Sequence, residues 1–126
     1  MALNKRALMT ELAQVCDKHN IERHRILITC GAAAVIHELR QETNDIDVEV
    51  LDERTWDNLT WLEQGTFKHY DALNLMPAAD VINIGNIDFH WRGGLPKDFD
   101  YTKIGVYRGF MCSTKRHILE DRIKLG

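Results

Sequence analysis

Between Asp45 and Val50 the chain alternates strictly between acidic and apolar residues, and no other stretch constrains the fold as tightly. Side chains of a β-strand point alternately to opposite faces of the sheet. The apolar set is Ile46, Val48 and Val50, and the acidic set is Asp45, Asp47 and Glu49. Asp45 and Asp47 then lie about 6.6–7 Å apart at their α-carbons, and carboxylates this close repel unless they meet water or a cation. The pattern predicts either a metal site on a strand or the solvated face of an edge strand.

A third carboxylate for such a site has to lie on a neighbouring strand, about 4.8 Å away and on the same face. The segment from Val81 to Trp91 predicts two strands joined by a turn at Gly85-Asn86. Asp88 is the only later acid in a convincing strand pattern, because it stands between two apolar residues of the second strand. His90 shares its face and is either a substrate contact or a structural or surface histidine. We therefore expect Asp45, Asp47 and Asp88 to form one cluster.

The residues before Asp45 add a second indication of function. In order they are an apolar strand, Ile26–Ile28, a small-residue turn, Cys30–Ala32, a helical pattern, Ala33–Leu39, and a polar link, Arg40–Asn44. Backbone N–H groups at a helix N-terminus favour anions. A turn containing Gly31 and Ala32 would let them approach a phosphate, although tight packing of strand on helix would explain the same glycine.

This sequence of elements resembles the nucleotidyltransferase superfamily of DNA polymerase beta type. It is most similar to the small prokaryotic members, which include the aminoglycoside and toxin–antitoxin nucleotidyltransferases. Their pattern is approximately hGGxAxxxxG…RxTxDID, and the residues in register here are Gly31, Ala33, Thr43, Asp45, Ile46 and Asp47. The chain departs from it at Cys30, where the family has its first glycine, and at Gln41, where the family has arginine and this chain has Arg40 beside it.

The resemblance implies a palm-type fold and a catalytic role for three acids, Asp45, Asp47 and Asp88. They would hold two Mg²⁺ (or Mn²⁺) ions, which in such sites lie about 3.5–4 Å apart. Asp88 would also act as base for the acceptor hydroxyl. The residues implied to bind the nucleotide are Gly31, Ala32, Thr43 and Lys124. Lys124 belongs to a basic late helix, which a solvated helix face would explain equally well.

The rest of the chain indicates an α/β (α+β) protein, with a small mixed sheet and helices mainly on one face. We expect residues 1–126 to form one domain, since this length allows one core rather than two. Helices are predicted over 3–19, 52–64 and 114–125, the first ended by Asn20 and the last capped by Ser113 with Ile118, Leu119 and Ile123 facing inward. Residues 104–107 predict a strand, 92–101 a loop, and 66–79 a short strand or ordered loop.

Composition excludes several classes of protein. The net charge of −3 and the pI near 6.0 argue against broad nucleic-acid binding, although a local basic patch stays possible. Three widely spaced cysteines predict reduced thiols rather than a disulfide framework. The chain shows no signal peptide and no apolar run long enough for a membrane span. We therefore expect a cytoplasmic protein without a membrane partner.

Two functional hypotheses follow. In the first, the chain moves NMP from an NTP to a hydroxyl of a protein, an RNA or a small molecule, and releases pyrophosphate. In the second, it is an inactive nucleotidyltransferase-fold protein that binds or inhibits a partner in a toxin–antitoxin or phage–host system. Because the chain leaves little room for an acceptor domain, we also expect a homodimer or a cognate partner to contact Phe67–Met76 or Arg92–Tyr101.

Overall fold

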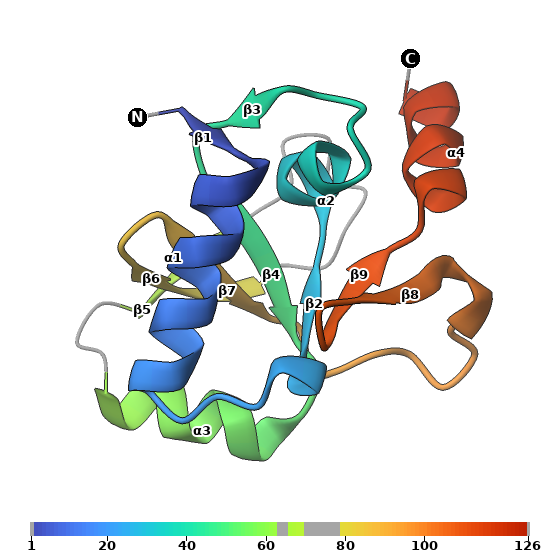
Figure 1. Cartoon of the computed structure of the whole chain (residues 1–126). Helices are drawn as coiled ribbons and strands as arrows, with labels where there is room; N and C mark the ends of the chain where they lie inside the picture. Colours follow the sequence, from blue (N-terminus) through green and yellow to red (C-terminus); the bar gives the residue numbers. More distant parts are fainter. Residues whose placement is uncertain (1, 63–65, 70–78, 126) are drawn as a thin grey trace.

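The computed structural model describes residues 2–62, 66–69 and 79–125, of which 61–62, 66–69 and 121–125 are described in backbone only (Figure 1). The fold is mixed α/β. Its strands are β1 (Leu3–Asn4), β2 (Ile26–Ile28), β3 (Glu42–Thr43), β4 (Ile46–Val50), β5 (Thr66–His69), β6 (Ala79–Ile84), β7 (Ile87–Trp91), β8 (Ile104–Tyr107) and β9 (Phe110–Ser113). Its helices are α1 (Lys5–Lys18), α2 (Cys30–Ile36), α3 (Glu53–Leu62) and α4 (Lys115–Leu125), with short 3-10 turns η1 (Arg23–Arg25) and η2 (Tyr101–Lys103).

The main sheet is mixed, with strand order β5-β6-β7-β4-β2-β9-β8 across the described residues. Strand β4 runs parallel to β7 and antiparallel to β2, and β2 runs parallel to β9. The predicted hairpin is confirmed as β6 and β7, joined by the turn at Gly85-Asn86. The strand pair β1–β3 forms a separate small ribbon that the sequence patterns had not indicated.

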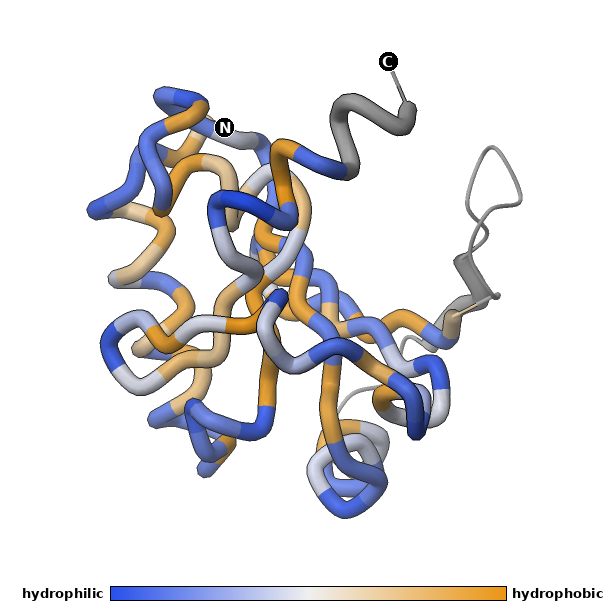
Figure 2. The backbone as a smooth tube through the Cα atoms, turned by 90° about the vertical axis from the view of Figure 1, so that its right-hand side faces the viewer, coloured by the Kyte–Doolittle hydropathy of each residue, from blue (hydrophilic) through white to orange (hydrophobic). Residues whose placement is uncertain are grey.

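The core lies between α1, α2 and α3 and one face of this sheet. The apolar residues of β4 are buried as predicted, with Ile46 and Val48 fully inaccessible to solvent. They belong to one cluster with Leu8 and Leu12 of α1. Hydrophobic residues run along the central strands and hydrophilic ones mark the outer turns (Figure 2). Alternate side chains along β4 and along β7 face this core, so the remaining side chains of each strand face away from α1.

Helix ends follow local hydrogen bonding. The side chain of Asn4 caps α1 by accepting from the N–H of Ala7, and Asn20 ends it with φ +56°, as predicted. The helix predicted over 33–39 lies three residues earlier in the chain, since α2 begins at Cys30 and ends at Ile36. Glu38 adopts a left-handed φ of +62°, and its N–H and that of Leu39 bond the last helical carbonyls, which stops the helix.

The C-terminal region corrects three predictions. A further strand, β9, follows the predicted strand β8 and pairs with the interior strand β2. Ser113 is the last residue of β9, and the helix is capped by Thr114, whose Oγ1 accepts from the N–H of His117. Leu119 does not face inward but is 40% exposed, whereas Ile118 is buried as expected. The side chain of Ile123 lies outside the described residues.

In the segment predicted as a short strand or loop, residues 66–69 form β5 at the edge of the sheet, and 70–78 lie outside the described residues. The expected contact segment Phe67–Met76 therefore falls mostly outside them. The loop predicted over 92–101 carries no helix or strand as far as Asp100, and its last residue, Tyr101, begins the 3-10 turn η2. Among the described helices, none combines the length and the apolar character that crossing a bilayer requires.

Candidate metal centre on the sheet

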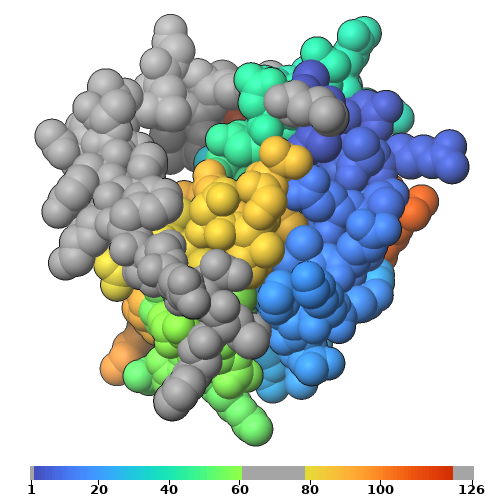
Figure 3. Space-filling model, turned by 90° about the vertical axis from the view of Figure 1, so that its left-hand side faces the viewer, coloured from blue at the N-terminus to red at the C-terminus, as the bar shows by residue number. Residues whose placement is uncertain are grey.

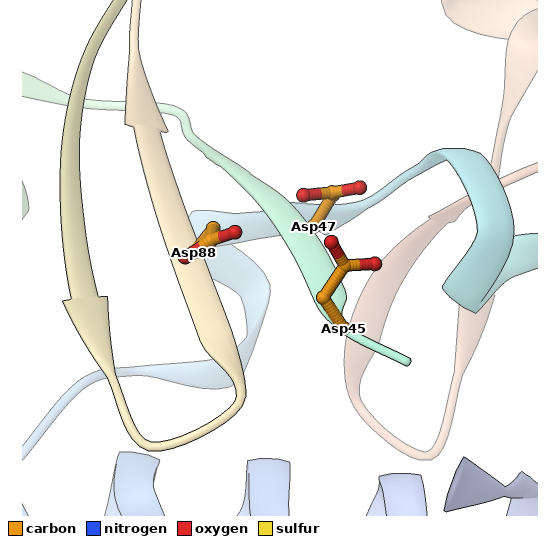
Figure 4. Close-up of side chains that lie close together, drawn as sticks. All are labelled: Asp45, Asp47 and Asp88. Atoms are coloured by element: carbon orange, nitrogen blue, oxygen red, sulfur yellow. The ribbon is translucent and has the colours of Figure 1, made fainter. Parts of the chain in front are cut away.

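Asp45, Asp47 and Asp88 come together on the face of the sheet that points away from α1. Asp47 and Asp88 are direct partners in the parallel register of β4 and β7. Asp45 immediately precedes β4. One carboxylate oxygen from each residue lies within 4.8 Å of the other two, and the three groups converge in Figure 4. The predicted cluster on adjacent strands is therefore confirmed as geometry.

Hydrogen bonds orient two side chains beside the cluster. Asn83, the register partner of Asp88 on β6, donates from Nδ2 to Asp88 Oδ1 at 2.8 Å and to the carbonyl of Ile87 at 3.3 Å. His90 is buried, and its Nδ1 lies 3.3 Å and 3.1 Å from the carbonyl oxygens of Val48 and Asp88. Because both oxygens are acceptors, Nδ1 carries the proton. The other ring nitrogen, Nε2, then faces Asp47 Oδ1 at 4.0 Å.

A cation stands next to the cluster on the same face. Arg92 forms an ion pair with Glu49, and the two side chains are only 15% and 20% exposed. Burial lowers the pKa of the Arg92 guanidinium, while the neighbouring Cys30 thiol and Asp47 carboxylate act in the opposite direction. Arg92 thus places positive charge close to both Cys30 and Asp47.

The turn at Gly31 packs against the polar link that leads into β4. A β-carbon at Gly31 would lie 2.9 Å from Thr43 Oγ1 and 2.8 Å from Arg40 Nη1, so a larger residue would require these side chains to shift. Thr43 is buried and donates from Oγ1 to the carbonyl of Asp45 at 3.2 Å. Gly31, Thr43 and Asp45 therefore form one contiguous region, and the guanidinium of Arg40 lies beside it.

The donor set fits a hard divalent cation. Carboxylate oxygens are the ligands that Mg²⁺ and Mn²⁺ prefer. Asp47 and Asp88 are partly buried while Asp45 is exposed, so a bound ion would be reachable from solvent. Clusters of exposed acids also occur without an ion, and here the oriented Asp88 carboxylate and the register of β4 with β7 add the order that a metal site requires.

Of the other two predicted nucleotide-binding residues, Ala32 is described with its side chain and Lys124 in its backbone only. Ala32 is buried in α2 directly after Gly31. Lys124 lies in the last turn of α4, and its side chain falls outside the described residues. Sequence patterns noted Arg40 beside the motif position but did not single out Asn83 or the pairing of Glu49 with Arg92. Asn83 lies in the predicted hairpin, five residues before Asp88, and a register count across that turn would have found it.

No family model matches the chain, and searches of curated proteins and of solved structures returned no match either. The structure itself therefore defines a class of fold and a candidate site. The fold is a mixed α/β sheet packed against helices, and the site is a cluster of three aspartates that could hold a divalent metal ion.

Proposed function

We propose that the chain is a metal-dependent nucleotidyltransferase with a palm of DNA polymerase beta type. It would transfer NMP from an NTP to a hydroxyl acceptor and release pyrophosphate. The observation that carries the proposal is the convergence of Asp45, Asp47 and Asp88 from two parallel neighbouring strands. It is supported by Gly31 and Thr43, which lie next to Asp45 in the order that the family motif has.

The reaction forms one bond and breaks another at the α-phosphorus. The acceptor oxygen attacks this phosphorus, and the bond to the bridging oxygen breaks, so that pyrophosphate leaves with the electron pair. When bound, Mg²⁺ or Mn²⁺ supplies charge neutralisation and alignment of the attacking and leaving oxygens. Asp45 and Asp47 would hold two such ions together with Asp88.

The protein's own groups would handle the proton and the phosphates. The proton of the acceptor hydroxyl passes to a carboxylate oxygen of Asp88, whose orientation Asn83 fixes. Arg92 and Arg40 place positive charge near the cluster and near Gly31, where the phosphates would lie. The backbone N–H groups at Gly31 and Ala32 would bind the nucleotide phosphates, beside the guanidinium of Arg40.

A transfer assay tests this proposal. The protein is incubated with Mg²⁺ or Mn²⁺, each of the four NTPs labelled at the α-phosphate, and candidate acceptors that include the protein itself, RNA and small hydroxyl compounds. We expect metal-dependent incorporation of label, lost in Asp47→Asn and Asp88→Asn. Asp57→Asn is the matched control, because Asp57 is an exposed acid on α3. Equal incorporation by wild type and Asp47→Asn would contradict the proposal.

The inactive binding or inhibitory protein is the second candidate, and one observation favours it. Cys30 replaces the first glycine of the motif, and it adopts a left-handed φ of +55° with an exposed side chain. A side chain in this position stands where a nucleotide phosphate would approach the turn. This candidate predicts binding of NTP and metal without transfer to any acceptor, so the same assay separates the two.

A further inference from the structure

A second charged surface, of opposite sign, lies on the α1 side of the sheet. It is a groove of about 700 Å³ between α1, η1 and the turn that joins β8 to β9. Figure 1 shows this turn directed toward α1. Four of its lining residues are cations: Lys5, Arg6, Arg23 and Arg108. We call these four residues and Tyr107 the basic groove.

Three of the four cations of the basic groove lie against aromatic rings. Lys5 Nζ lies 5.2 Å from the centre of the Tyr107 ring, and the Arg108 guanidinium lies 5.6 Å from it. Arg23 lies 5.0 Å from the centre of the Phe110 ring and donates to the carbonyl of Arg108 at 3.3 Å. Cation–π contacts position a charge without neutralising it. Three of the four charges are therefore positioned before any ligand arrives.

The charge of the basic groove is largely uncompensated within the described residues. No acidic side chain is among those that line it. Asp17 approaches Arg23 only at 3.9 Å, from a side chain that is 74% exposed. Other cations have closer carboxylate partners: Arg25 lies 3.2 Å from Asp52, and Arg116 lies 3.0 Å from Glu120. In a chain of net charge −3 this concentration is local.

We propose that the basic groove binds the phosphate backbone of a single-stranded nucleic acid. Several separate cations along a groove match a ligand with regularly repeated negative charge, which a strand of linked phosphates provides. A concave groove admits a flexible strand, whereas a duplex is a stiff convex rod and would meet only the rim. Since Lys5 and Arg108 already contact the Tyr107 ring, recognition rests on phosphates rather than on base stacking. The proposal does not depend on nucleotidyl transfer.

Fluorescence anisotropy with a labelled 12-nucleotide single-stranded RNA tests it over a series of salt concentrations. We expect binding in the range of about 10⁻⁴–10⁻⁶ M, with a logarithmic salt slope of about −0.7 for each phosphate contact. Arg6→Gln and Arg108→Asn should each weaken binding and reduce the slope by about 0.7. Asparagine is chosen because residue 108 has φ +52°, a conformation that asparagine tolerates. Lys97→Gln, in an exposed loop, is the matched control and should bind as wild type does.

Three results would overturn the proposal. The first is no RNA binding at about 100 µM protein in low salt. The second is equal binding by the groove variants and Lys97→Gln. The third is displacement of the RNA by poly-glutamate or by a duplex at equal charge concentration, which would assign the groove to an acidic protein or to duplex. Asp47→Asn should bind RNA at least as well as wild type, so failure of the triad and failure of the groove are separable.

Discussion

The acidic cluster and the basic groove are opposite in charge and in construction. The cluster is compact: three carboxylates from two adjacent strands bring ligand oxygens within 4.8 Å of one another. The groove is spread over about 700 Å³ and takes its cations from α1, η1 and the β8–β9 turn. Backbone pairing between β4 and β7 positions the first, whereas aromatic rings contact three of the four cations of the second.

The difference suggests distinct kinds of ligand. Like charges at short range repel, and a small divalent cation relieves this repulsion. Cations spread along a groove repel less and suit an extended anion. The two surfaces share one core, because α1 packs through Leu12 on the face of the sheet opposite to Asp47.

Truncation of the shared core should damage both surfaces together. Leu12 is fully buried in α1, so Leu12→Ala should lower the free energy of unfolding by about 2–5 kcal/mol. Urea denaturation measures this loss, and Leu119→Ala, at a 40% exposed position, is the control with an expected change within about 0.5 kcal/mol. Equal effects of the two substitutions would show that α1 does not pack as described.

Loss of the hydrogen bonds between α1 and the β6–β7 turn should affect the acidic cluster more than the basic groove. Glu11 accepts from the N–H and Nδ2 of Asn86, at 2.8 Å and 2.7 Å. The two elements lie side by side at the surface (Figure 3). Glu11→Ala leaves both donors without this acceptor and should cost about 1–3 kcal/mol in unfolding free energy. Gln14→Ala, exposed on the same helix, is the control, and an equal result for both would remove this role of Glu11.

Replacing Cys30 by glycine should affect the acidic side alone. A left-handed conformation costs a residue other than glycine about 1–2 kcal/mol. Glycine avoids this cost but lowers stability by about 0.4–1 kcal/mol, because its unfolded chain has more conformational entropy. Since Cys30 has φ +55°, Cys30→Gly should raise the free energy of unfolding by up to about 1.6 kcal/mol. Thermal denaturation compares it with Cys30→Ala, which retains the strained conformation. The account expects glycine to be the more stable, and a less stable glycine variant would refute it.

The rate of thiol modification should distinguish Cys30 from the two buried cysteines in the folded protein. Burial raises the pKa of Cys16 and of Cys112 to about 12, so at pH 8 only about one in 10⁴ of these thiols is ionised. Cys30 is exposed. Titration of native protein with Ellman's reagent should therefore modify Cys30 rapidly and the other two only after unfolding, and Cys30→Ala should react slowly throughout. Rapid modification of Cys16 would contradict the packing of α1.

Local periodicity made the acidic site predictable. The alternation from Asp45 to Val50 and the hairpin around Gly85 each specify which face a side chain takes, and pairing of the two strands then brings Asp88 beside Asp47. The parallel pairing itself joins residues about forty positions apart, and local pattern supplied only the shared polar face. That shared face motivated the expectation that the three acids meet, and the family resemblance added the roles that they would have.

Other features depended on interactions that no local pattern contains. The strand Phe110–Ser113 was missed because only four residues follow the short turn at Arg108-Gly109, and its partner β2 lies far earlier in the chain. Leu119 was placed inward because helical periodicity does not reveal how far a terminal helix extends beyond the sheet. The basic groove combines residues separated by about a hundred positions, so composition could indicate no more than a possible local patch.

The central claim, that Asp45, Asp47 and Asp88 form a metal-dependent nucleotide site, is tested most directly by calorimetric titration of NTP in the presence and absence of Mg²⁺ or Mn²⁺. The account predicts binding of at least one NTP that requires the metal, and a loss of more than about 100-fold in affinity in Asp47→Asn, since even residues that merely orient metal ligands change affinity about 10–100-fold. Asp57→Asn should bind as wild type does. Absence of metal-dependent binding for all four NTPs, or unchanged affinity in Asp47→Asn, would contradict the account.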